Sequence, residues 1–323
     1  SKIVLITNSP PNLLIKGALD VLDGKIFESI YHYKKSFLSQ LRLLMFLRLN
    51  KSQKLYYLPT TQSNERKIIR DLIFFKYLGG IKNIVGIENF KKIKLEDKNK
   101  NINSTIKESD RLWEIANQDN KLVYPKRPYI KFNPECLEKF SSLISKIDNA
   151  SIVYAIGHGT KFEEKNWGVN NFIKLISNLL RKNKNILILL FGGSEDIKQA
   201  ELIKSQIKNK KLLILSGKTN IQESAALISL CTLYIGNDTG TMHIASAMKV
   251  PCLALFSNMS KKGKWEPFGN NNRIIRKDII CGSCKKGIKL KSFYCPECVA
   301  LSMKAIKFKE VIKVHDQMIK TLL

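Results

Sequence analysis

The amino-acid sequence predicts an α/β protein whose second half holds a parallel sheet with helices on both faces. Short aliphatic runs alternate strictly with helical segments over residues 152–256, and this alternation is typical of βαβ units. One run, Ile186–Phe191, is apolar at every position, as expected of a strand buried on both faces. Small and polar residues follow several strands, at the end of a parallel sheet where ligands bind.

The elements of the second half follow from apolar runs and helical spacing. We expect strands at 152–156, 186–191, 212–215, 233–235 and 252–256. We expect helices at 170–183, 195–208, 221–230 and 240–248.

The first half is less regular. The sequence predicts strands at Ile3–Thr7 and Leu55–Leu58, and helices at 37–49, 65–78 and 136–147. Residues 91–128 are rich in Lys, Asn and Asp with few periodic apolar positions, so we expect irregular structure there. Polar residues after 147 place a domain boundary at 150, which gives domains 1–150 and 151–323.

The charge is strongly positive, because 55 Lys and Arg stand against 27 Asp and Glu, for a net charge of +28. Such an excess suits nucleic acid, an anionic membrane surface or a polyanionic substrate. No apolar run approaches the roughly 20 residues of a spanning helix, and no secretion signal is recognisable, so a cytosolic protein is expected. The tail 261–323 is especially basic, with 15 basic and 5 acidic residues.

Two loops after predicted strands have the composition of anion-binding sites. Residues 157–160 (GHGT) precede Lys161, Lys165 and Trp167, so flexible backbone, a hydroxyl and cations occur together. Residues 236–243 (GNDTGTMH) lead into a small-residue helix, whose positive end would face the same crevice. The sequence therefore predicts a site for an anionic ligand.

These loops, with Gly192–Glu195 and the GKT run at 217–219, resemble the ADP-heptose:lipopolysaccharide heptosyltransferases of glycosyltransferase family 9. The resemblance covers most of residues 150–323. It implies a GT-B architecture, with two Rossmann-like domains whose parallel sheets face a cleft. The C-terminal domain would bind the nucleotide sugar, and the N-terminal domain would bind the acceptor.

The resemblance also implies residue roles and a reaction. The implied donor-binding residues are Thr160, Lys161, Lys165, Glu195, Asp238, Thr239, Gly240 and His243. The implied reaction is an inverting, metal-independent transfer of a heptose or related sugar. The donor would be a nucleoside-diphosphate sugar such as ADP-heptose, and the acceptor the anionic lipopolysaccharide inner core. The enzyme would act in the cytoplasm at the periphery of the inner membrane, in contact with anionic lipid.

The sequence departs from the family at its beginning. Family members open with a strand and a Gly-Asp loop whose Asp is the proposed base, whereas here one βα unit of about 30 residues is expected to be missing. We therefore name no catalytic residue, and read Asp20 and Asp23 as turn or surface residues.

The predicted helix 65–78 carries candidates for acceptor binding, the basic residues Arg66, Lys67 and Arg70. Its buried flank would hold Ile69, Leu72 and Ile73. The alternative is that the basic residues form a solvated helix face.

Four late cysteines have the spacing of a zinc site: Cys281, Cys284, Cys295 and Cys298. A structural zinc is expected rather than disulfides in a cytosolic protein. The other three cysteines lie in apolar elements and are expected in the core.

Two other functions remain open from the sequence. A nucleic-acid-binding protein with a zinc ribbon would explain the charge and the cysteines, but would leave the 238–243 motif unused. A catalytically silent homologue that only binds nucleotide sugar would follow from the absent N-terminal loop.

Overall fold

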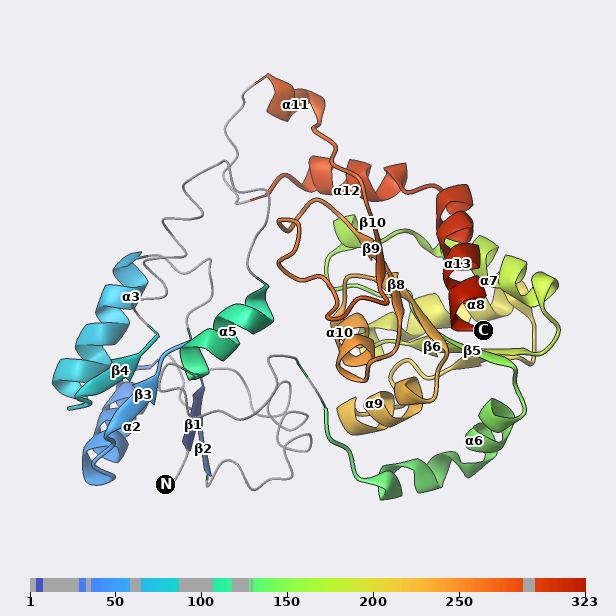
Figure 1. The fold of residues 1–323 in the computed structure, drawn as a ribbon. Helices are drawn as coiled ribbons and strands as arrows, with labels where there is room; N and C mark the ends of the chain where they lie inside the picture. Colours follow the sequence, from blue (N-terminus) through green and yellow to red (C-terminus); the bar gives the residue numbers. More distant parts are fainter. Residues whose placement is uncertain are drawn as a thin grey trace. The chain divides into compact units, whose positions relative to one another are not determined.

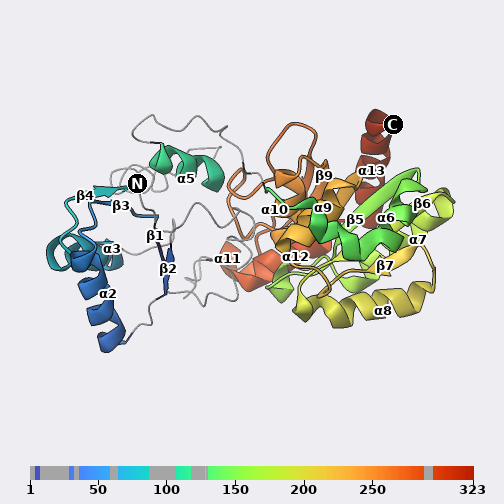
Figure 2. The same cartoon turned by 90° about the horizontal axis from the view of Figure 1, so that it is seen from below.

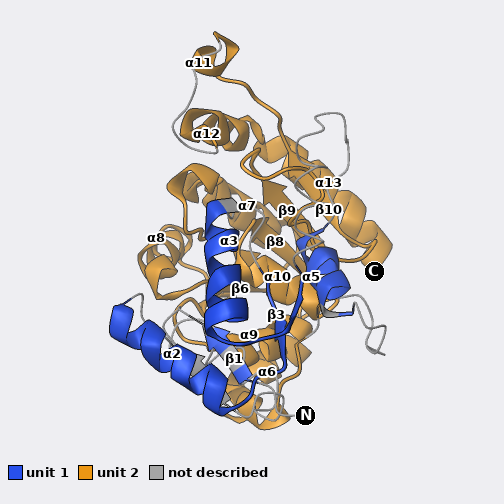
Figure 3. Ribbon diagram, turned by 90° about the vertical axis from the view of Figure 1, so that its left-hand side faces the viewer, with its two compact units in different colours: residues 1–19, 24–127 blue, residues 20–23, 128–323 orange. Residues whose placement is uncertain are grey.

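The structure is a computed structural model, and it describes residues 4–7, 29–32, 36–58, 65–86, 107–117, 128, 130–286 and 294–323. The chain divides into two compact units, coloured separately in Figure 3. Unit 1 comprises residues 1–19 and 24–127, and unit 2 comprises residues 20–23 and 128–323.

Unit 2 is built on a six-stranded parallel sheet (Figure 1). Its strands are β5 (Ile152–Gly157), β6 (Ile186–Phe191), β7 (Leu212–Ile214), β8 (Leu233–Asn237), β9 (Cys252–Phe256) and β10 (Arg273–Arg276). Their order is β10-β9-β8-β5-β6-β7, so the chain winds outward in both directions from the pair β5 and β8. The five strands predicted from the sequence are present, and β10 is an addition at the edge.

Helices cover both faces of this sheet, as Figure 2 shows. One face is covered by α7 (Val169–Lys182), α8 (Ile197–Ile207), α12 (Pro296–Ala305) and α13 (Phe308–Leu322). The other is covered by α6 (Ser141–Asp148), α9 (Ile221–Ser229) and α10 (Gly240–Ala247). Successive strand residues point to opposite faces, so Tyr154 joins the first cluster while Val153 and Ala155 join the second. Strands apolar at every position therefore fill both cores.

The boundary between the units falls after Arg127, not at residue 150 as the sequence suggested. The 3₁₀ helix η2 (Pro134–Phe140) and α6 pack on the second face of the unit 2 sheet, where Ile147 is buried. Lys139 of η2 also pairs with Glu223 of α9 at 2.5 Å. These contacts make residues 128–150 part of unit 2. The segment belongs to the unit in which its apolar side chains are buried, and the polar residues at its end do not mark a domain boundary.

The described part of unit 1 contains two pairs of parallel strands and three helical segments. The strand pairs are β1 (Val4–Thr7) with β2 (Ser29–His32), and β3 (Lys54–Tyr56) with β4 (Asn83–Val85). The helical segments are α2 (Phe37–Leu49), α3 (Glu65–Leu72) continued by the π-helix η1 (Ile73–Leu78), and α5 (Glu108–Ala116). Leu43, Leu47 and Ile81 form the centre of the described core.

The structure corrects the expectation for residues 91–128. Helix α5 lies within residues 91–128, where the sequence predicted irregular structure. It is stabilised by burial of Ile115 and by a buried ion pair between Arg111 and Glu108. Its nine residues span fewer than three turns, which is too short a stretch to show a clear periodic pattern in the sequence.

Among the described residues, no helix combines the length and the apolar character needed to cross a membrane.

Candidate functional site

A pocket of about 260 Å³ lies at the carboxyl ends of β5, β6 and β8 in unit 2. Its walls are residues 159–162 and Lys165 after β5, residues 191–193, 195 and 196 at the end of β6, and residues 238–241 after β8. Strand β5 lies between β6 and β8, where the order of the sheet reverses. Open parallel sheets bind ligands at this point, because the loops on either side diverge and leave a crevice.

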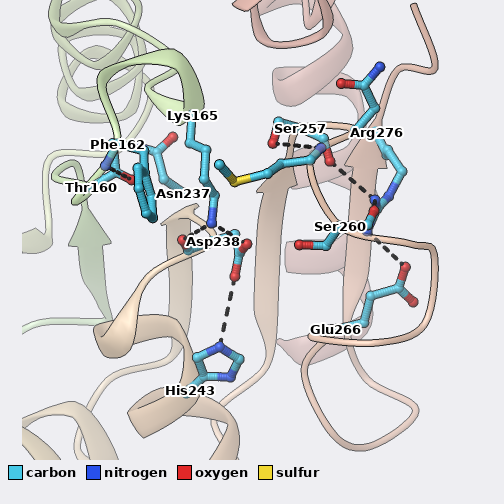
Figure 4. A network of polar contacts seen from close by, with 12 residues as sticks. Thr160, Phe162, Lys165, Asn237, Asp238, His243, Ser257, Ser260, Glu266 and Arg276 are labelled. Atoms are coloured by element: carbon cyan, nitrogen blue, oxygen red, sulfur yellow. Dashed lines mark hydrogen bonds and ion pairs between the residues drawn. The ribbon is translucent and has the colours of Figure 1, made fainter. Parts of the chain in front are cut away.

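An ion pair crosses the pocket (Figure 4). The Nζ atom of Lys165 donates to the Asp238 carboxylate at 2.5 Å and to the Asp238 carbonyl oxygen at 3.2 Å. Both side chains are largely buried, at 12% and 8% exposure. His243 follows, with Nε2 3.8 Å from the other carboxylate oxygen of Asp238. Asp238 therefore holds the Lys165 ammonium group at the pocket, and the His243 ring lies nearby.

The N-terminus of α10 supplies the positive end of a helix to the same pocket. Thr239 is its N-cap residue and makes no side-chain capping bond, while Thr239 Oγ1 lies 3.0 Å from Thr241 Oγ1. A Cβ atom placed on Gly240 would meet no atom within 4 Å, so the helix start is open. Amides at a helix start favour an anion, and the two hydroxyls can donate to one.

Two glycines make room for a carboxylate that the sequence analysis missed. A Cβ atom on Gly159 or on Gly192 would collide with the Asp196 side chain. That side chain holds the loop together, since Asp196 Oδ2 accepts a bond from the Gly193 amide at 2.9 Å. Burial raises the pKa of Asp196 above its usual value. The glycines thus allow the loops after β5 and β6 to meet around Asp196.

The structure gathers most of the donor-binding residues that the resemblance implied. Seven of them line the pocket: Thr160, Lys161, Lys165, Glu195, Asp238, Thr239 and Gly240. His243 is outside the lining and 45% exposed, and its ring meets Trp265 edge to face. Phe162, Asp196 and Thr241 also line the pocket. Thr241 could have been chosen from its place in the 236–243 motif, whereas Phe162 and Asp196 carry no local signal.

Buried polar residues join the loops after β5 and β8 next to the pocket. Asn237 Nδ2 donates to the His158 carbonyl oxygen at 2.8 Å, and Asn237 Oδ1 accepts from the Trp167 amide at 3.2 Å. His158 Nε2 lies 3.1 Å from Ser216 Oγ, and its side chain is fully buried. Burial lowers the pKa of His158 to about 4. These hydrogen bonds therefore fix the loop after β5 relative to the end of β8.

We expect this histidine to make stability depend on pH. Its pKa is about 4 when folded, against about 6.5 in an unfolded chain. The unfolded state then binds more protons between these values, so stability is complete above pH 6.5 and is lost as the pH falls toward 4, by about 3 kcal/mol. Denaturant titrations across this range should show a shallower loss for His158→Gln than for the wild type. Equal slopes would assign the acid sensitivity to other groups.

The four late cysteines also come together in unit 2. Their sulfur atoms all lie within 4.8 Å of one another. Cys281 Sγ is 3.7 Å from Cys295 Sγ, close to the ~3.8 Å separation of two sulfurs on one tetrahedral zinc with Zn–S bonds of about 2.3 Å. The amide of Cys281 donates to Cys298 Sγ at 3.2 Å. The group of four cysteines can therefore hold a metal ion.

The other three cysteines were expected in the core. Cys231 and Cys252 are buried as expected, whereas Cys136 is partly exposed.

The basic residues on α3 are placed on the surface of unit 1. Arg66, Lys67 and Arg70 are all exposed, and Arg70 pairs with Asp71 at 2.8 Å. The expected buried flank is wrong, because Ile69 and Ile73 are 57% and 48% exposed. Ile68 is buried instead, at 5%. The helix is turned so that its basic and apolar residues reach the surface together.

The two acidic residues near the start of the chain, Asp20 and Asp23, lie outside the described residues.

With this geometry in place, comparison with known proteins is informative. Residues 95–293, more than half of the chain, match the model of "Glycosyltransferase family 9 (heptosyltransferase)". The chain belongs to glycosyltransferase family 9. The resemblance stated from the sequence motifs is thereby confirmed.

Similar family 9 proteins include "Lipooligosaccharide heptosyltransferase 2" of Haemophilus influenzae, 30% identical over 158 residues, which are 46% of this chain and 44% of the relative. The protein of the same name from Campylobacter jejuni serotype O:6 is 28% identical over 175 residues, or 52% and 51% of the two chains. The chain spans about half the length of the curated relatives it matches.

Solved family 9 structures share the fold. The glycosyltransferase of Veillonella parvula aligns with a TM-score of 0.66 at 17% identity, covering 99% of this chain and 89% of that one. Escherichia coli ADP-heptose heptosyltransferase II aligns with a TM-score of 0.62 at 16% identity, covering 99% of each chain. The predicted α/β fold with parallel sheets is confirmed, and it matches the GT-B heptosyltransferases.

Proposed function

We propose that this family 9 chain transfers a heptose or related sugar from a nucleoside-diphosphate sugar, ADP-heptose in the simplest case, to the lipopolysaccharide inner core. The observation that supports the proposal most strongly is the pocket of unit 2, where Lys165, Asp238 and the start of α10 converge. The proposed place of action is the cytoplasmic face of the inner membrane. The names of the relatives, which are lipooligosaccharide and lipopolysaccharide heptosyltransferases, support the choice of sugar and acceptor.

The reaction that fits this site is a direct displacement. An acceptor hydroxyl oxygen attacks the anomeric carbon from the face opposite the leaving group, and the bond from that carbon to the phosphate oxygen breaks with both electrons leaving on the diphosphate. A base takes the hydroxyl proton. The released nucleoside diphosphate gains a negative charge. Lys165 and the amides at the start of α10 lie where they can stabilise this charge without a metal ion.

We assign the remaining donor residues by position. Thr160, Lys161 and Thr239 line the pocket and would contact the diphosphate, while Glu195 at the end of β6 would accept a hydrogen bond from the ribose. His243 lies beyond Asp238 and would reach the sugar.

We also propose that the acceptor binds unit 1 and that the donor binds unit 2. Arg66, Lys67 and Arg70 are exposed, and guanidinium groups pair with carboxylates and phosphates through two bonds. We expect Arg66→Ala with Arg70→Ala to raise the KM for a lipopolysaccharide acceptor by roughly tenfold, the value of one or two charged hydrogen bonds, while ADP affinity stays unchanged. Steady-state kinetics with varied acceptor would measure this. An unchanged KM would leave this helix a solvated surface.

Mass spectrometry of the acceptor tests the proposed function directly. The chain is incubated with ADP-heptose and a heptose-deficient lipopolysaccharide core, and the core is expected to gain the mass of one heptose while ADP is released. Binding of ADP without any transfer would instead support a silent nucleotide-sugar-binding homologue. No binding of any nucleoside diphosphate would exclude the function.

We also propose that the four-cysteine group holds one structural zinc ion. Four thiolates complete a tetrahedral shell, so no position remains for a water or substrate molecule. The zinc would hold α11 (Gly282–Lys285), which begins after Cys281, against the first turn of α12, which contains Cys298. Its role is therefore stability rather than catalysis.

A further inference from the structure

Helix α2 of unit 1 presents a row of large apolar side chains to water. Its exposed members are Phe37, Leu38, Leu41, Met45 and Leu49, at 74%, 69%, 40%, 63% and 78% exposure. We call these five residues the α2 stripe. Their spacing places them along one side of the helix. The opposite side carries the buried Leu43 and Leu47, so α2 is apolar on two sides and polar only at Ser39, Gln40, Arg42 and Arg48.

The inner side of α2 fixes the helix to its unit. Leu43 and Leu47 are buried, at 0% and 1% exposure, and pack with Ile81 and Phe74. At the start of the helix, the side chain of the N-cap residue Ser36 accepts a hydrogen bond from the Ser39 amide at 3.4 Å. The α2 stripe is therefore held outward by a formed core, and its exposure does not require the helix to come loose.

A neighbouring helix adds exposed apolar side chains close to one end of the stripe. Arg48 Nε donates to the Leu78 carbonyl oxygen at 2.8 Å, which places the end of η1 beside the end of α2. Tyr77 and Leu78 there are 69% and 49% exposed. Grouped apolar exposure of this kind marks an interaction surface. A tyrosine suits the boundary between lipid and water, because its ring is apolar and its hydroxyl polar.

The surroundings of the stripe are cationic. Residues 36–58 contain four basic side chains, among them Arg42 and Arg48, and no Asp or Glu. Residues 65–86 contain five basic and two acidic side chains. One of these acids, Asp71, accepts a bond from Tyr57 Oη at 2.7 Å and pairs with Arg70. A partner for this surface must therefore accept apolar side chains and carry negative charge at once.

An anionic lipid surface meets both requirements. Its acyl region takes up apolar side chains, and its headgroups attract basic residues at the same depth. Nucleic acid would pair with the arginines but leave the apolar stripe in water. A second copy of this chain would bring together two molecules of net charge +28. The positive charge and the exposed apolar side chains of this surface together favour an anionic lipid surface over nucleic acid or a second copy of the chain.

We propose that the α2 stripe, with Tyr77 and Leu78, is the surface by which the chain binds an anionic bilayer, with Arg42 and Arg48 on the headgroups. The proposal rests on the proposed function, since a lipid-anchored acceptor lies in such a bilayer, and it names the contact surface. Binding at the membrane would restrict the search for the acceptor to two dimensions.

Vesicle sedimentation tests the proposal with the whole chain. We expect binding to phosphatidylcholine vesicles containing phosphatidylglycerol, weaker binding to phosphatidylcholine alone, and weakening with added salt. The double variant Leu38→Gln with Met45→Gln should lose roughly tenfold or more of its partition into lipid. The matched control is Leu202→Gln with Leu230→Gln in unit 2, whose side chains are 47% and 39% exposed. This control should sediment like the wild type.

Two results would overturn the proposal. Equal sedimentation of the stripe variant and the wild type would remove the stripe from lipid binding. Loss of a dimer in the stripe variant, with lipid binding retained, would assign the stripe to self-association. Calorimetry with ADP separates this question from the proposed function. If ADP binds normally while the vesicle result is negative, only the lipid surface is wrong, and if ADP fails to bind, the donor site is wrong.

Discussion

Replacement of Lys165 by methionine is expected to weaken ADP binding by about 100-fold. Two losses act together. The diphosphate loses a cation, and the Asp238 carboxylate, 8% exposed and 2.5 Å from the lysine Nζ, is left without that charge beside an anionic ligand. Hydrogen bonds to charged groups contribute about 1.5–3 kcal/mol, so the combined loss reaches two orders of magnitude. Methionine keeps the length of the side chain and limits the effect on packing.

A second substitution separates the two losses. In Lys165→Met with Asp238→Asn, the unpaired carboxylate is gone, so part of the ADP affinity should return. The control Lys174→Met removes an exposed lysine of α7 and should leave the Kd for ADP unchanged. Isothermal calorimetry measures all four proteins. An unchanged Kd in Lys165→Met would remove this lysine from the donor site.

Loss of one cysteine ligand is expected to have the second large effect. In Cys298→Ser, the zinc content should fall from one ion to well below one per chain, and Tm should drop by roughly 10 °C. Donor binding should weaken as well. Helix α12, which carries Cys298, packs against the short helix η3 (Glu163–Lys165), and Trp167 Nε1 donates to the Ile306 carbonyl oxygen at 2.9 Å just after α12. A loosened α12 therefore disturbs the position of Lys165.

The matched control is Cys136→Ser, a partly exposed cysteine of η2 outside the group. It should keep one zinc and the wild-type Tm. Treatment of the unmodified chain with a chelator, followed by added zinc, gives a test that does not depend on folding of a variant. Elemental analysis showing well under one zinc per untreated chain would refute the site, and the cysteines would then be reduced thiols.

The sequence predicted unit 2 better than unit 1 for a physical reason. In unit 2, strands such as Ile186–Phe191 are buried on both faces, and helix starts carry strong local signals. At α9, Asn220 accepts from the Glu223 amide while Glu223 accepts from the Asn220 amide, each within 2.9 Å. In unit 1, β2 and β4 are short and mix polar with apolar residues, so they lack the aliphatic run that marks an equally short strand such as β7.

Part of the candidate site was also predictable from composition. The residues after β5 and β8 combine glycines, hydroxyls and charge, and parallel strands bring such loops to one edge of the sheet. These loops therefore made Thr160, Lys165, Asp238 and Gly240 candidates before the structure placed them around one pocket. The α2 stripe was not predictable, because helical spacing shows that a residue lies on a face and does not show which face the rest of the chain will cover.

The sequence by itself determined the alternation of strands and helices in unit 2, the polar loops at its strand ends and the spacing of the cysteines, since each depends on neighbouring residues. Tertiary structure alone decided that Lys165 meets Asp238, 73 residues away, and that Asp196 fits between Gly159 and Gly192. Such contacts depend on the strand order β8-β5-β6, which no local pattern encodes. Burial likewise decided the boundary after Arg127 and the outward position of Ile69, because it is a property of the whole packed unit.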